Sequence, residues 1–596
     1  MKILGIHDGH NASASLMVDG KVILALGEER LSRNKHQYGF PQRSINKILN
    51  ICNLSTKEID KVAMSTKTLP PRYFLTQRNS NFSVSDYWKE QNEYWYPLLI
   101  KGEKTKYTEI FKKYINYETF PYDLKLIKNE DDDEGMWRAR KKHLCEVLNF
   151  DSNNLDVFDH HKSHAAYGYC TSSLYKKKPL LIFTIDGGGD NTNATISICS
   201  ENGEITEISR SSNANIGRIY RSITLLLGMR PSDHEFKVMG LAAYNTQGYS
   251  QEAYKVFKNT LKVDGLQFDY HTPLKDHFFY FKDRLEGQRF DSIAFALQKI
   301  TEELLCEWIK NAVNKTSIKD IVISGGVAQN IKANQQILSM NEVNSLYIPP
   351  GPGDESISIG AAYLSTLKNA SKEKVSIKIP QFDPYCGTSY SDNEIELYLK
   401  TLDKDKWSFK YSNNKEIALL LSKGKVIARF SNGKMEFGAR ALGNRSIIAD
   451  PSSADVIHYL NKLVKMRDFW MPFAPSILEE RLCDYLIDKK KNISKYMAIS
   501  FNSTEIANKH LPAGLHPFDK TSRAQIVYKK DNPDYHSLIK EFENLTGIGA
   551  LLNTSFNIHG EAIVESPKDA IQTLQNSGLK YLYIGSYLVT KTIEGN

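Results

Sequence analysis

The sequence predicts an α/β protein with a duplicated N-terminal part and a separate C-terminal α/β unit. Two observations indicate the duplication: a pattern of strand, acidic glycine turn, strand, tight turn and strand opens the chain, and the same pattern returns after residue 180. A third observation, a run rich in glycine and arginine in the last third of the chain, indicates a C-terminal unit with a chemistry of its own. At 596 residues the chain is also too long for one hydrophobic core, so two or three domains are expected.

The two copies can be assigned element by element. The first copy is a strand over 2–6, the turn Asp8-Gly9, a strand over 12–18, the hairpin turn Asp19-Gly20 and a strand over 21–27. The second copy is a strand over 180–185, the turn Asp186-Gly187-Gly188-Gly189, a strand over 193–199, the turn Asn202-Gly203 and a strand over 204–210. Two such copies predict two acidic glycine loops facing one cleft, as in an actin-like or sugar-kinase-like core.

The regions around the copies complete the predicted N-terminal domain. Residues 70–145 are rich in aromatic and charged side chains and predict a mostly helical insertion, which either selects an acceptor or simply packs by its aromatic residues. Residues 290–313 have helical spacing, and 321–323 form the centre of a buried strand. This strand runs into Gly325-Gly326, whose N–H groups at a helix start favour phosphate binding.

Composition changes set the expected domain limits. We expect an actin-like domain over 1–368, a linker rich in Lys, Ser and Pro over 369–390, and a second α/β domain over 391–596. Seven scattered cysteines indicate reduced thiols, and without a signal-type segment or an apolar run of membrane-spanning length we expect a cytoplasmic protein with no membrane partner. A formal net charge of +8 fits anionic substrates or nucleic acid.

A candidate metal site lies in the run from Asp159 to Ala166. On a helix, His160 and His164 are one turn apart on the same face, and Asp354 in a distant Pro-Gly-Asp turn can close the site. Imidazole and carboxylate ligands suit a borderline divalent ion such as iron, zinc or manganese. The alternative is a helix with three histidines near a surface.

A second cluster of candidate site residues is cationic and lies in the C-terminal unit. Residues 431–446 combine glycine turns with three cations, and further cations follow in the Lys465-Met466-Arg467 run and at Arg523. Guanidinium forks match phosphate or carboxylate oxygens, so their convergence would make an anion pocket. The alternative is that each arginine pairs with a surface acid.

These motifs together resemble the O-carbamoyltransferases that act on nodulation factors, antibiotics such as cephamycin and tobramycin, and related molecules. The resemblance covers nearly the whole chain. Its motifs are His10-Asn11-Ala12-Ser13-Ala14, Glu28-Glu29-Arg30, Lys35-His36, His160 to His164, Glu235, Lys237-Val238-Met239-Gly240-Leu241-Ala242, Gly325-Gly326, Gly353-Asp354 and Met435 to Ser446. It implies an N-terminal domain like the threonylcarbamoyl transferase of tRNA modification and a C-terminal domain like threonylcarbamoyl-adenylate synthase.

The resemblance also implies a reaction in two steps. The C-terminal domain would make carbamoyl-adenylate from carbamoyl phosphate and ATP, and the N-terminal domain would transfer the carbamoyl group to an acceptor hydroxyl. The implied contacts to the phosphorylated substrates are Lys434, Arg440, Arg445, Lys465, Arg467 and Arg523, with Asn553 and Asn557 either orienting carbamoyl phosphate or capping turns. The expected cofactors are therefore ATP, carbamoyl phosphate and a divalent metal, Fe²⁺ first.

In the N-terminal domain the implied roles fall on three groups of residues. The metal ligands are His160, His164 and Asp354, with Asp186 at the same ion directly or through water. His10 is the implied general base, with His7 as a competitor, and Lys35 contacts phosphate or adenylate unless it is an ordinary loop lysine. The implied nucleotide contacts, which could instead be packing residues, are Asp186, Gly187, Gly188, Glu235, Lys237, Gly240, Gly325, Gly326 and Asn330.

The chain departs from the family pattern at Met471, which stands where an arginine is usual, and at Ala439 and Ala562, which stand where proline is usual. The first change bears on carbamoyl phosphate binding and the others on loop stiffness. Two alternative functions remain at this point: a threonylcarbamoyl-type transferase acting on tRNA, and a non-catalytic actin-like nucleotide-binding module. The acceptor is expected to be a sugar or natural-product hydroxyl, or a hydroxymethylated base in DNA, and a homodimer is compatible with the sequence.

Overall fold

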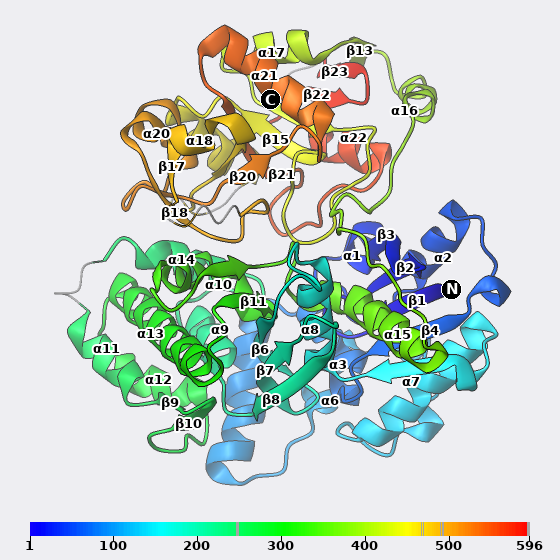
Figure 1. The fold of residues 1–596 in the computed structure, drawn as a ribbon, viewed down its shortest axis with the longest axis vertical. Helices are drawn as coiled ribbons and strands as arrows, with labels where there is room; N and C mark the ends of the chain where they lie inside the picture. Colours follow the sequence, from blue (N-terminus) through cyan, green and yellow to red (C-terminus); the bar gives the residue numbers. More distant parts are fainter. Residues whose placement is uncertain (246–249, 466–467, 469, 489, 491–493, 593–596) are drawn as a thin grey trace. The chain divides into compact units, whose positions relative to one another are not determined.

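The computed structural model describes the chain except for residues 246–249, 466–467, 469, 489, 491–493 and 593–596. The chain forms two compact units (Figure 1). Unit 1 comprises residues 1–32 and 36–382, and unit 2 comprises residues 33–35 and 383–596. The main division therefore falls inside the segment 369–390 expected as a linker, and helix α15 (Ile357–Glu373) continues beyond residue 368.

Unit 1 contains two five-stranded sheets with the same topology. Their orders are β3-β2-β1-β4-β5 and β8-β7-β6-β11-β12, with antiparallel pairing among the first three strands and parallel pairing among the last three. The first sheet consists of β1 (Lys2–His7), β2 (Ser13–Val18), β3 (Lys21–Gly27), β4 (Lys61–Ser65) and β5 (Leu155–Phe158). The second consists of β6 (Leu180–Gly189), β7 (Thr192–Cys199), β8 (Ile205–Ser211), β11 (Asp320–Ser324) and β12 (Ser345–Tyr347). The repeated order confirms the predicted duplication.

Two central helices pack closely against these sheets and against each other. Helix α8 (His160–Thr171) is almost entirely buried, and α15 packs on it and on β1. Glycines allow this approach, because a Cβ on Gly360 would lie 2.0 Å from the Ser163 carbonyl oxygen and one on Gly5 would lie 2.1 Å from that of Ser358. These close contacts fix the start of α8 relative to α15 and, through α15, relative to β1.

The segment 70–145 is mostly helical, as predicted. It contains α3 (Pro71–Thr76), α4 (Arg78–Asn81), α5 (Val84–Lys89), the π-helix η2 (Glu90–Lys101), α6 (Tyr107–Ile110), η3 (Lys112–Tyr114), η4 (Leu124–Leu126) and α7 (Asp133–Leu148). Aromatic side chains such as Phe82, Tyr94 and Tyr107 form its core, together with Phe278 and Phe279. The aromatic residues of the segment thus serve packing.

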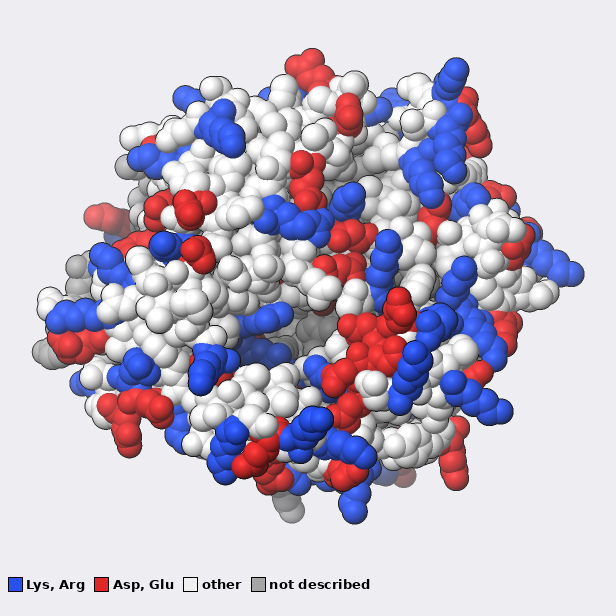
Figure 2. Space-filling model, turned by 90° about the horizontal axis from the view of Figure 1, so that it is seen from below, with Lys and Arg blue, Asp and Glu red and all other residues white. Residues whose placement is uncertain are grey.

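The remaining elements of unit 1 surround the two sheets. They are α1 (Glu28–Ser32), α2 (Gln42–Ile51), η1 (Thr56–Glu58), η5 (Ser152–Asn154), α9 (Ile216–Leu226), α10 (Glu235–Ala242), α11 (Gln251–Lys258), β9 (Leu261–Asp264), β10 (Gln267–Tyr270), α12 (His277–Leu285), α13 (Phe290–Thr316), η7 (Gly326–Gln329), α14 (Ile331–Ser339) and η8 (Asp354–Ser356). Lysine and arginine are mixed with acidic side chains over the face shown in Figure 2.

Unit 2 is built on an eight-stranded mixed sheet of order β13-β23-β22-β14-β15-β21-β16-β20. Its strands are β13 (Trp407–Tyr411), β14 (Ile427–Phe430), β15 (Arg445–Ala449), β16 (Ala474–Leu478), β20 (Gln525–Val527), β21 (Ala550–Ser555), β22 (Tyr581–Ile584) and β23 (Tyr587–Lys591). A small sheet contains β17 (Leu486–Ile487), β18 (Phe501–Ser503) and β19 (Thr521–Ser522). Buried apolar residues on the central strands, such as Phe430, Ile447 and Leu582, form the core.

Short helices complete unit 2. They are α16 (Asp392–Leu399), α17 (Asn414–Ser422), α18 (Asp455–Tyr459), the π-helix η9 (Leu460–Lys465), η10 (Glu479–Arg481), α19 (Leu482–Tyr485), α20 (Glu505–His510), η11 (Pro512–Gly514), α21 (Pro533–Thr546) and α22 (Pro567–Gln575). Across the described parts of both units, every helix is too short or too polar to pass through a bilayer.

Candidate functional site

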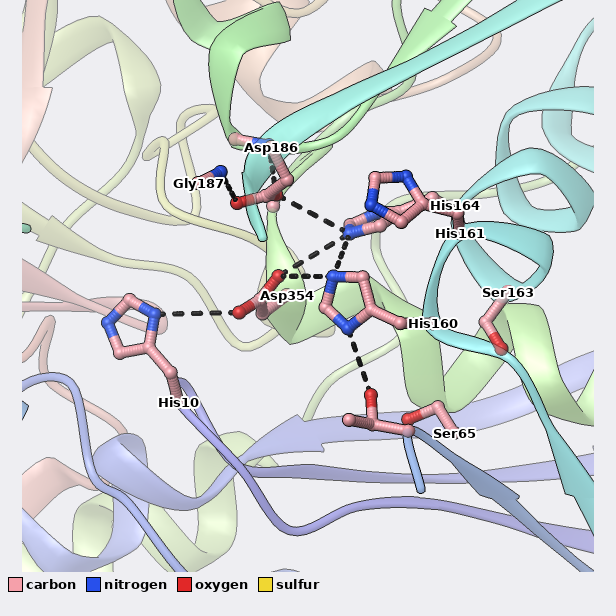
Figure 3. A network of polar contacts seen from close by, with 12 residues as sticks. His10, Ser65, His160, His161, Ser163, His164, Asp186, Gly187 and Asp354 are labelled. Atoms are coloured by element: carbon pink, nitrogen blue, oxygen red, sulfur yellow. Dashed lines mark hydrogen bonds and ion pairs between the residues drawn. The ribbon is translucent and has the colours of Figure 1, made fainter. Parts of the chain in front are cut away.

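Four side chains predicted as metal ligands come together in unit 1. His160 and His164 come from the first turns of α8, Asp186 from the glycine-rich end of β6, and Asp354 from the start of η8 (Figure 3). One potential ligand atom from each lies within 4.8 Å of all the others. The histidines are buried and the carboxylates are partly buried. The helical spacing of the histidines therefore places both rings on one side of α8, as predicted.

The separations between these atoms fit one small cation. Nε2 of His160 lies 3.2 Å from Nε2 of His164, and these atoms lie 3.5 and 3.4 Å from Oδ1 of Asp354. Nε2 of His164 is also 3.5 Å from Oδ2 of Asp186. Donor atoms about 2.1 Å from a divalent ion are about 3.0 to 3.5 Å apart in octahedral or tetrahedral geometry. Oδ1 of Asp354 is buried without a hydrogen-bond partner among the described residues, so the donor set and its spacing fit a metal ion.

The local sequence explains how α8 presents its histidines. The N-cap residue Asp159 accepts a hydrogen bond from the backbone N–H of Lys162, which starts the helix directly before His160. The third histidine of the run, His161, bonds to the Thr184 hydroxyl and the Thr192 carbonyl. It therefore joins α8 to the second sheet and takes no part in the metal cluster.

The two carboxylates of the cluster differ in electrostatic environment. Burial, followed by the negative charge of Asp354, raises the pKa of Asp186 above its usual value. Burial alone would also raise the pKa of Asp354, but the imidazoles of His160, His10 and His164 hold it well below its usual range. Asp354 is therefore ionised, and a cation between the carboxylates would favour the ionised form of both.

His10, the predicted general base, lies beside this cluster. Its Nδ1 is 3.6 Å from Oδ2 of Asp354, the oxygen that faces away from His160 and His164 (Figure 3). Its Nε2 has no hydrogen-bond partner among the described residues. The ring thus has one nitrogen facing a carboxylate and one buried nitrogen without a hydrogen-bond partner among the described residues.

The competitor His7 has a structural role. Its Nε2 lies 2.8 Å from the His10 carbonyl oxygen, which can only accept a hydrogen bond, and its Nδ1 lies 3.1 Å from the Ser65 hydroxyl. Burial lowers the pKa of His7 to about 4, so the ring is neutral. Both nitrogens are engaged, and His7 fixes the backbone of His10.

Further titratable groups surround His10. The ring of His36 lies 5.5 Å from that of His10, and its Nε2 is 3.1 Å from Asp233. Burial, followed by hydrogen-bond and charge effects, leaves Glu235 with a pKa raised to about 7. Burial also raises the pKa of Glu355 to about 7, with the charge of Asp354 adding to the effect. Two carboxyl groups near His10 therefore titrate near neutral pH.

The glycine loops predicted to bind nucleotide are engaged by the protein itself. Gly326 donates its N–H to Oδ2 of Asp186 at 2.6 Å, and Gly325 donates its N–H to the Pro352 carbonyl at 2.8 Å. These two N–H groups hold Asp186 and the Asp354 loop in place, so in this conformation neither is directed to a phosphate. The carbonyl of Gly187 accepts hydrogen bonds from Asn193 at 3.0 Å and Arg218 at 2.8 Å, while Gly188 adopts a φ of +142°.

Four other predicted nucleotide contacts lie on or at the start of helices, and the nucleotide role of one of them, Glu235 on α10, stays a prediction. Asn330 caps α14 by accepting from the Ala333 N–H, and also bonds to Gln298. Lys237 is 6% exposed on α10, where Gly240 also lies. Asn330 is thus occupied by helix capping, and the positions of Lys237 and Gly240 leave their nucleotide roles as predictions.

In unit 2, Arg445 is buried in the sheet. It lies on β15, is fully buried, donates to the carbonyls of Ser431 and Asn444 at 2.8 and 2.9 Å, and covers the ring of Phe430 at 3.6 Å. Burial lowers the pKa of Arg445 to about 10. Its hydrogen bonds to these two carbonyls hold the loop before β15, and a surface acid is not its partner in them.

Two predicted asparagines lie on and after β21. Asn553 donates to the Ala441 carbonyl at 3.1 Å, to Ser476 and to Gln525, while its Oδ1 is buried without a partner among the described residues. Asn557 accepts from Ser555 at 2.6 Å and donates to the Glu561 carbonyl at 2.7 Å. Asn557 thus stabilises a turn, whereas Asn553 retains an unused acceptor.

The other predicted cations of unit 2 differ in exposure. Lys434 is exposed, whereas Arg440 and Arg523 are partly buried. Met471, which stands where an arginine is usual in the family, is 5% exposed. Lys35 belongs to the short segment 33–35 of unit 2 and is partly buried. Arg467 and the side chain of Lys465 lie outside the described residues.

Sequence reasoning missed several residues that organise the site. Thr66 and Asp190 contact His160, Arg218 contacts the Gly187 loop, and Glu436 accepts hydrogen bonds from the N–H groups of Leu442 and Arg445. Thr66, Asp190 and Arg218 act on residues that lie 30 or more positions away in the sequence, whereas Glu436 acts within its own loop. Among these residues, only Asp190 has a local sequence signal, because it is an acidic residue directly after the glycine run 187–189.

The duplicated fold and the buried histidine and carboxylate cluster define an actin-like protein with a candidate metal centre. Residues 2–363 match the family model described as "Carbamoyltransferase N-terminus", and residues 418–591 match "Carbamoyltransferase C-terminus". The chain therefore belongs to the carbamoyltransferase family, as its motifs predicted.

The chain is also similar to curated proteins over most of its length. The chain is 32% identical to an uncharacterised protein of Methanocaldococcus jannaschii, with all of both chains covered. It is 28% identical to nodulation protein NolNO of Sinorhizobium fredii, covering 98% of this chain and 79% of that protein. It is 30% identical to nodulation protein NolO of Bradyrhizobium diazoefficiens, covering 73% of this chain and 79% of the relative.

Similarity to solved structures is lower. An activator of 2-hydroxyisocaproyl-CoA dehydratase from Clostridium difficile is 12% identical, covering 63% of this chain and 99% of that chain, with a TM-score of 0.31. Full-length HypF is 12% identical, covering 63% and 47% of the respective chains, with a TM-score of 0.32. The family assignment accordingly rests on the sequence matches, and the duplication rests on the strand order.

Proposed function

We propose that this carbamoyltransferase uses ATP and carbamoyl phosphate to form carbamoyl-adenylate, and then transfers the carbamoyl group to an acceptor hydroxyl. The observation that carries the proposal is the placement of His10 beside Asp354, whose other oxygen faces the two histidines of α8. A base next to a candidate cation site suits acyl transfer to an alcohol. A nucleotide-binding module without group transfer needs neither feature.

The proposed activation step belongs to unit 2. With one water molecule, carbamoyl phosphate and ATP yield carbamoyl-adenylate, phosphate and pyrophosphate. Both substrates are polyanions, so the cations Lys434, Arg440 and Arg523 are suited to bind them. The unused acceptor Oδ1 of Asn553 is suited to the carbamoyl NH₂ group.

The proposed transfer step belongs to unit 1. His10 takes the proton of the acceptor hydroxyl at Nε2, while Asp354 at Nδ1 stabilises the imidazolium that forms. The acceptor oxygen bonds to the carbamoyl carbon, and the bond from that carbon to the adenylate oxygen breaks with its electron pair on AMP. A divalent cation held by His160, His164, Asp186 and Asp354, with Fe²⁺ proposed first, would supply Lewis-acid polarisation of the carbamoyl carbonyl.

For the acceptor, we propose a hydroxyl of a sugar or another small natural product. The resemblance of the chain's motifs to O-carbamoyltransferases of nodulation factors and antibiotics supports this choice, and nodulation proteins are among its relatives. The alternative acceptor, a hydroxymethylated base in DNA, would require a continuous basic track along the surface of the protein.

The experiment is a mass-spectrometric screen with the full-length protein, ATP, carbamoyl phosphate, and pooled sugars, natural products and hydroxymethylated DNA. The proposal predicts a carbamoyl mass gain on a hydroxyl compound together with pyrophosphate release. Pyrophosphate release that requires threonine and bicarbonate in place of carbamoyl phosphate would favour the threonylcarbamoyl alternative. ATP binding without pyrophosphate release under any of these conditions would favour the non-catalytic module.

A further inference from the structure

Thr66 has a backbone conformation that β-branched residues rarely adopt. It directly follows β4 and has a φ of +71°, in the left-handed region. Such strain persists only where the surrounding contacts over-determine the conformation, and it often occurs at functional sites. The strained residue Thr66 lies next to the candidate metal cluster, where such strain is expected to serve a function.

The side chain of Thr66 contacts one of the two ligand histidines. Its hydroxyl oxygen lies 2.9 Å from Nδ1 of His160, and both side chains are buried. The other nitrogen of this ring, Nε2, faces Asp354 and His164. A neutral imidazole carries one hydrogen, so an Nδ1–H that donates to Thr66 leaves the Nε2 lone pair for a cation.

Backbone contacts hold Thr66 in this conformation. Its N–H donates to the Phe158 carbonyl at 3.1 Å, and its carbonyl accepts from Nη2 of Arg140 at 3.0 Å. Arg140 also donates to the Lys67 carbonyl at 2.9 Å and forms a fully buried ion pair with Asp8. The buried pair therefore acts as a rigid anchor for the 66–67 segment.

Asp190 ties the same segment to the start of α8. Its Oδ1 accepts from the N–H groups of Lys67 and Thr68 at 2.8 and 2.7 Å, while its Oδ2 accepts from the N–H of His160 at 2.9 Å. The preceding residue, Gly189, lies directly against the ring of His160, because a Cβ on Gly189 would lie 2.2 Å from Cγ of His160. The imidazole is thus enclosed between Thr66 and the 189–190 loop.

We propose that Thr66 is a positioning residue that selects the Nδ1–H tautomer of His160 and aims its Nε2 at the cation. Arg140 and Asp190 hold Thr66 in the strained conformation that this requires. The contrast with His164 supports this role, because Nδ1 of His164 has no hydrogen-bond partner among the described residues. Of the two ligand rings, only that of His160 therefore has a hydrogen-bond partner at Nδ1 among the described residues. The inference rests on the metal site of the proposed function.

The test measures how tightly the metal-stripped full-length wild type and its variants bind Co²⁺. Binding is monitored through the visible absorption of the bound ion. Thr66→Val keeps the branched side chain and removes the hydroxyl, whereas Thr66→Ser keeps the hydroxyl. Loss of a partner to a ligand histidine typically weakens metal binding by about 10- to 100-fold. We expect a loss of this size in Thr66→Val and affinity close to that of the wild type in Thr66→Ser.

The matched control is Thr301→Val, which removes a hydroxyl that is equally buried but bonds within α13. It should bind Co²⁺ as the wild type does. If far-UV circular dichroism shows that Thr66→Val is unfolded, Thr66→Ala takes its place with the same expected loss. Wild-type affinity in the variant without the hydroxyl, or an equal loss in Thr66→Ser, would overturn the assignment alone. A wild-type protein that binds no Co²⁺ would overturn both the metal site and the assignment.

Discussion

Nδ1 of His10 lies 3.6 Å from Oδ2 of Asp354, and Oδ1 of the same carboxylate lies 3.4 Å from Nε2 of His164. One carboxylate thus connects the candidate base to the candidate cation site. Because Asp354 is held ionised by the surrounding imidazoles, it can orient His10 and stabilise its protonated form at the same time. Proton transfer and metal binding are therefore expected to depend on one another in unit 1.

Replacement of His10 should separate the two half-reactions. His10→Ala is expected to lower carbamoyl transfer by about 10²- to 10⁴-fold, since a positioned general base contributes on that scale. Pyrophosphate release, which we assign to unit 2, should remain. Both products are measured in one assay, and the exposed His271→Ala serves as the control. Loss of both activities in His10→Ala alone would contradict the division of labour.

A side chain on Gly189, which lies against the ring of His160, should destabilise the protein and weaken metal binding. In Gly189→Ala the new Cβ would meet ring atoms at 2.2 to 2.5 Å, so we expect destabilisation by about 1–3 kcal/mol together with weaker metal binding. Gly187→Ala, two residues earlier, has open space for its Cβ and should leave both properties unchanged. Chemical denaturation and Co²⁺ titration measure the two effects. Equal behaviour of the two variants would mean that the ring position is wrong.

The separation of predictable from unpredictable features is clear at this site. The strand and turn periodicity predicted the duplicated sheets, and the spacing of His160 and His164 predicted one shared face, because both signals are local. Thr66 could not be found in this way, since its role depends on a left-handed backbone conformation and on a contact with a residue far along the chain. Such features arise only when β4 and β5, which lie far apart in the sequence, pair in the folded sheet.

Arg445 illustrates a different limit. A glycine-flanked arginine predicts an anion-binding fork, but burial depends on tertiary packing, and here the side chain lies within the sheet and donates to backbone carbonyls. The same holds for Gly325 and Gly326, whose N–H groups are used by Pro352 and Asp186. In both cases the partners of these groups could be assigned only from the folded chain.

The buried Glu235 should impose a pH dependence on stability. Burial raises its pKa in the folded chain from 4.5 to about 7, so between these values the folded state binds more protons than the unfolded state. The free energy of unfolding therefore falls as pH rises through this window. Glu235→Gln can still accept the Ser232 N–H bond. The difference in unfolding free energy between this variant and the wild type should therefore grow, in favour of the variant, by about 3 kcal/mol as the pH rises from below 4.5 to above 7.

Urea denaturation at a series of pH values measures this difference. The exposed Glu286→Gln is the control and should follow the wild-type profile. A Glu235→Gln profile parallel to that of the wild type across the same range would show that Glu235 titrates as an ordinary surface carboxyl group.

Arg523 should affect only the activation step. Arg523→Ala is expected to lower pyrophosphate release strongly, because a charge-assisted contact to a polyanionic substrate is lost. Transfer from supplied carbamoyl-adenylate should survive, since unit 1 is untouched. Arg481→Ala, which removes a unit 2 arginine paired with Asp484 and Glu543, is the control. If transfer from the supplied intermediate fell as well, Arg523 would have been assigned to the wrong half-reaction.

The central claim is that unit 1 transfers an activated carbamoyl group to an alcohol at the cluster of α8 histidines and two aspartates, which would hold a divalent cation that polarises the carbamoyl carbonyl. The most direct measurement is the metal content of the purified protein, combined with transfer from supplied carbamoyl-adenylate before and after strong chelation. We predict a bound divalent ion, loss of transfer on chelation, and its recovery when the ion is restored. A protein that contains no metal and keeps full transfer activity in the chelator would contradict the account.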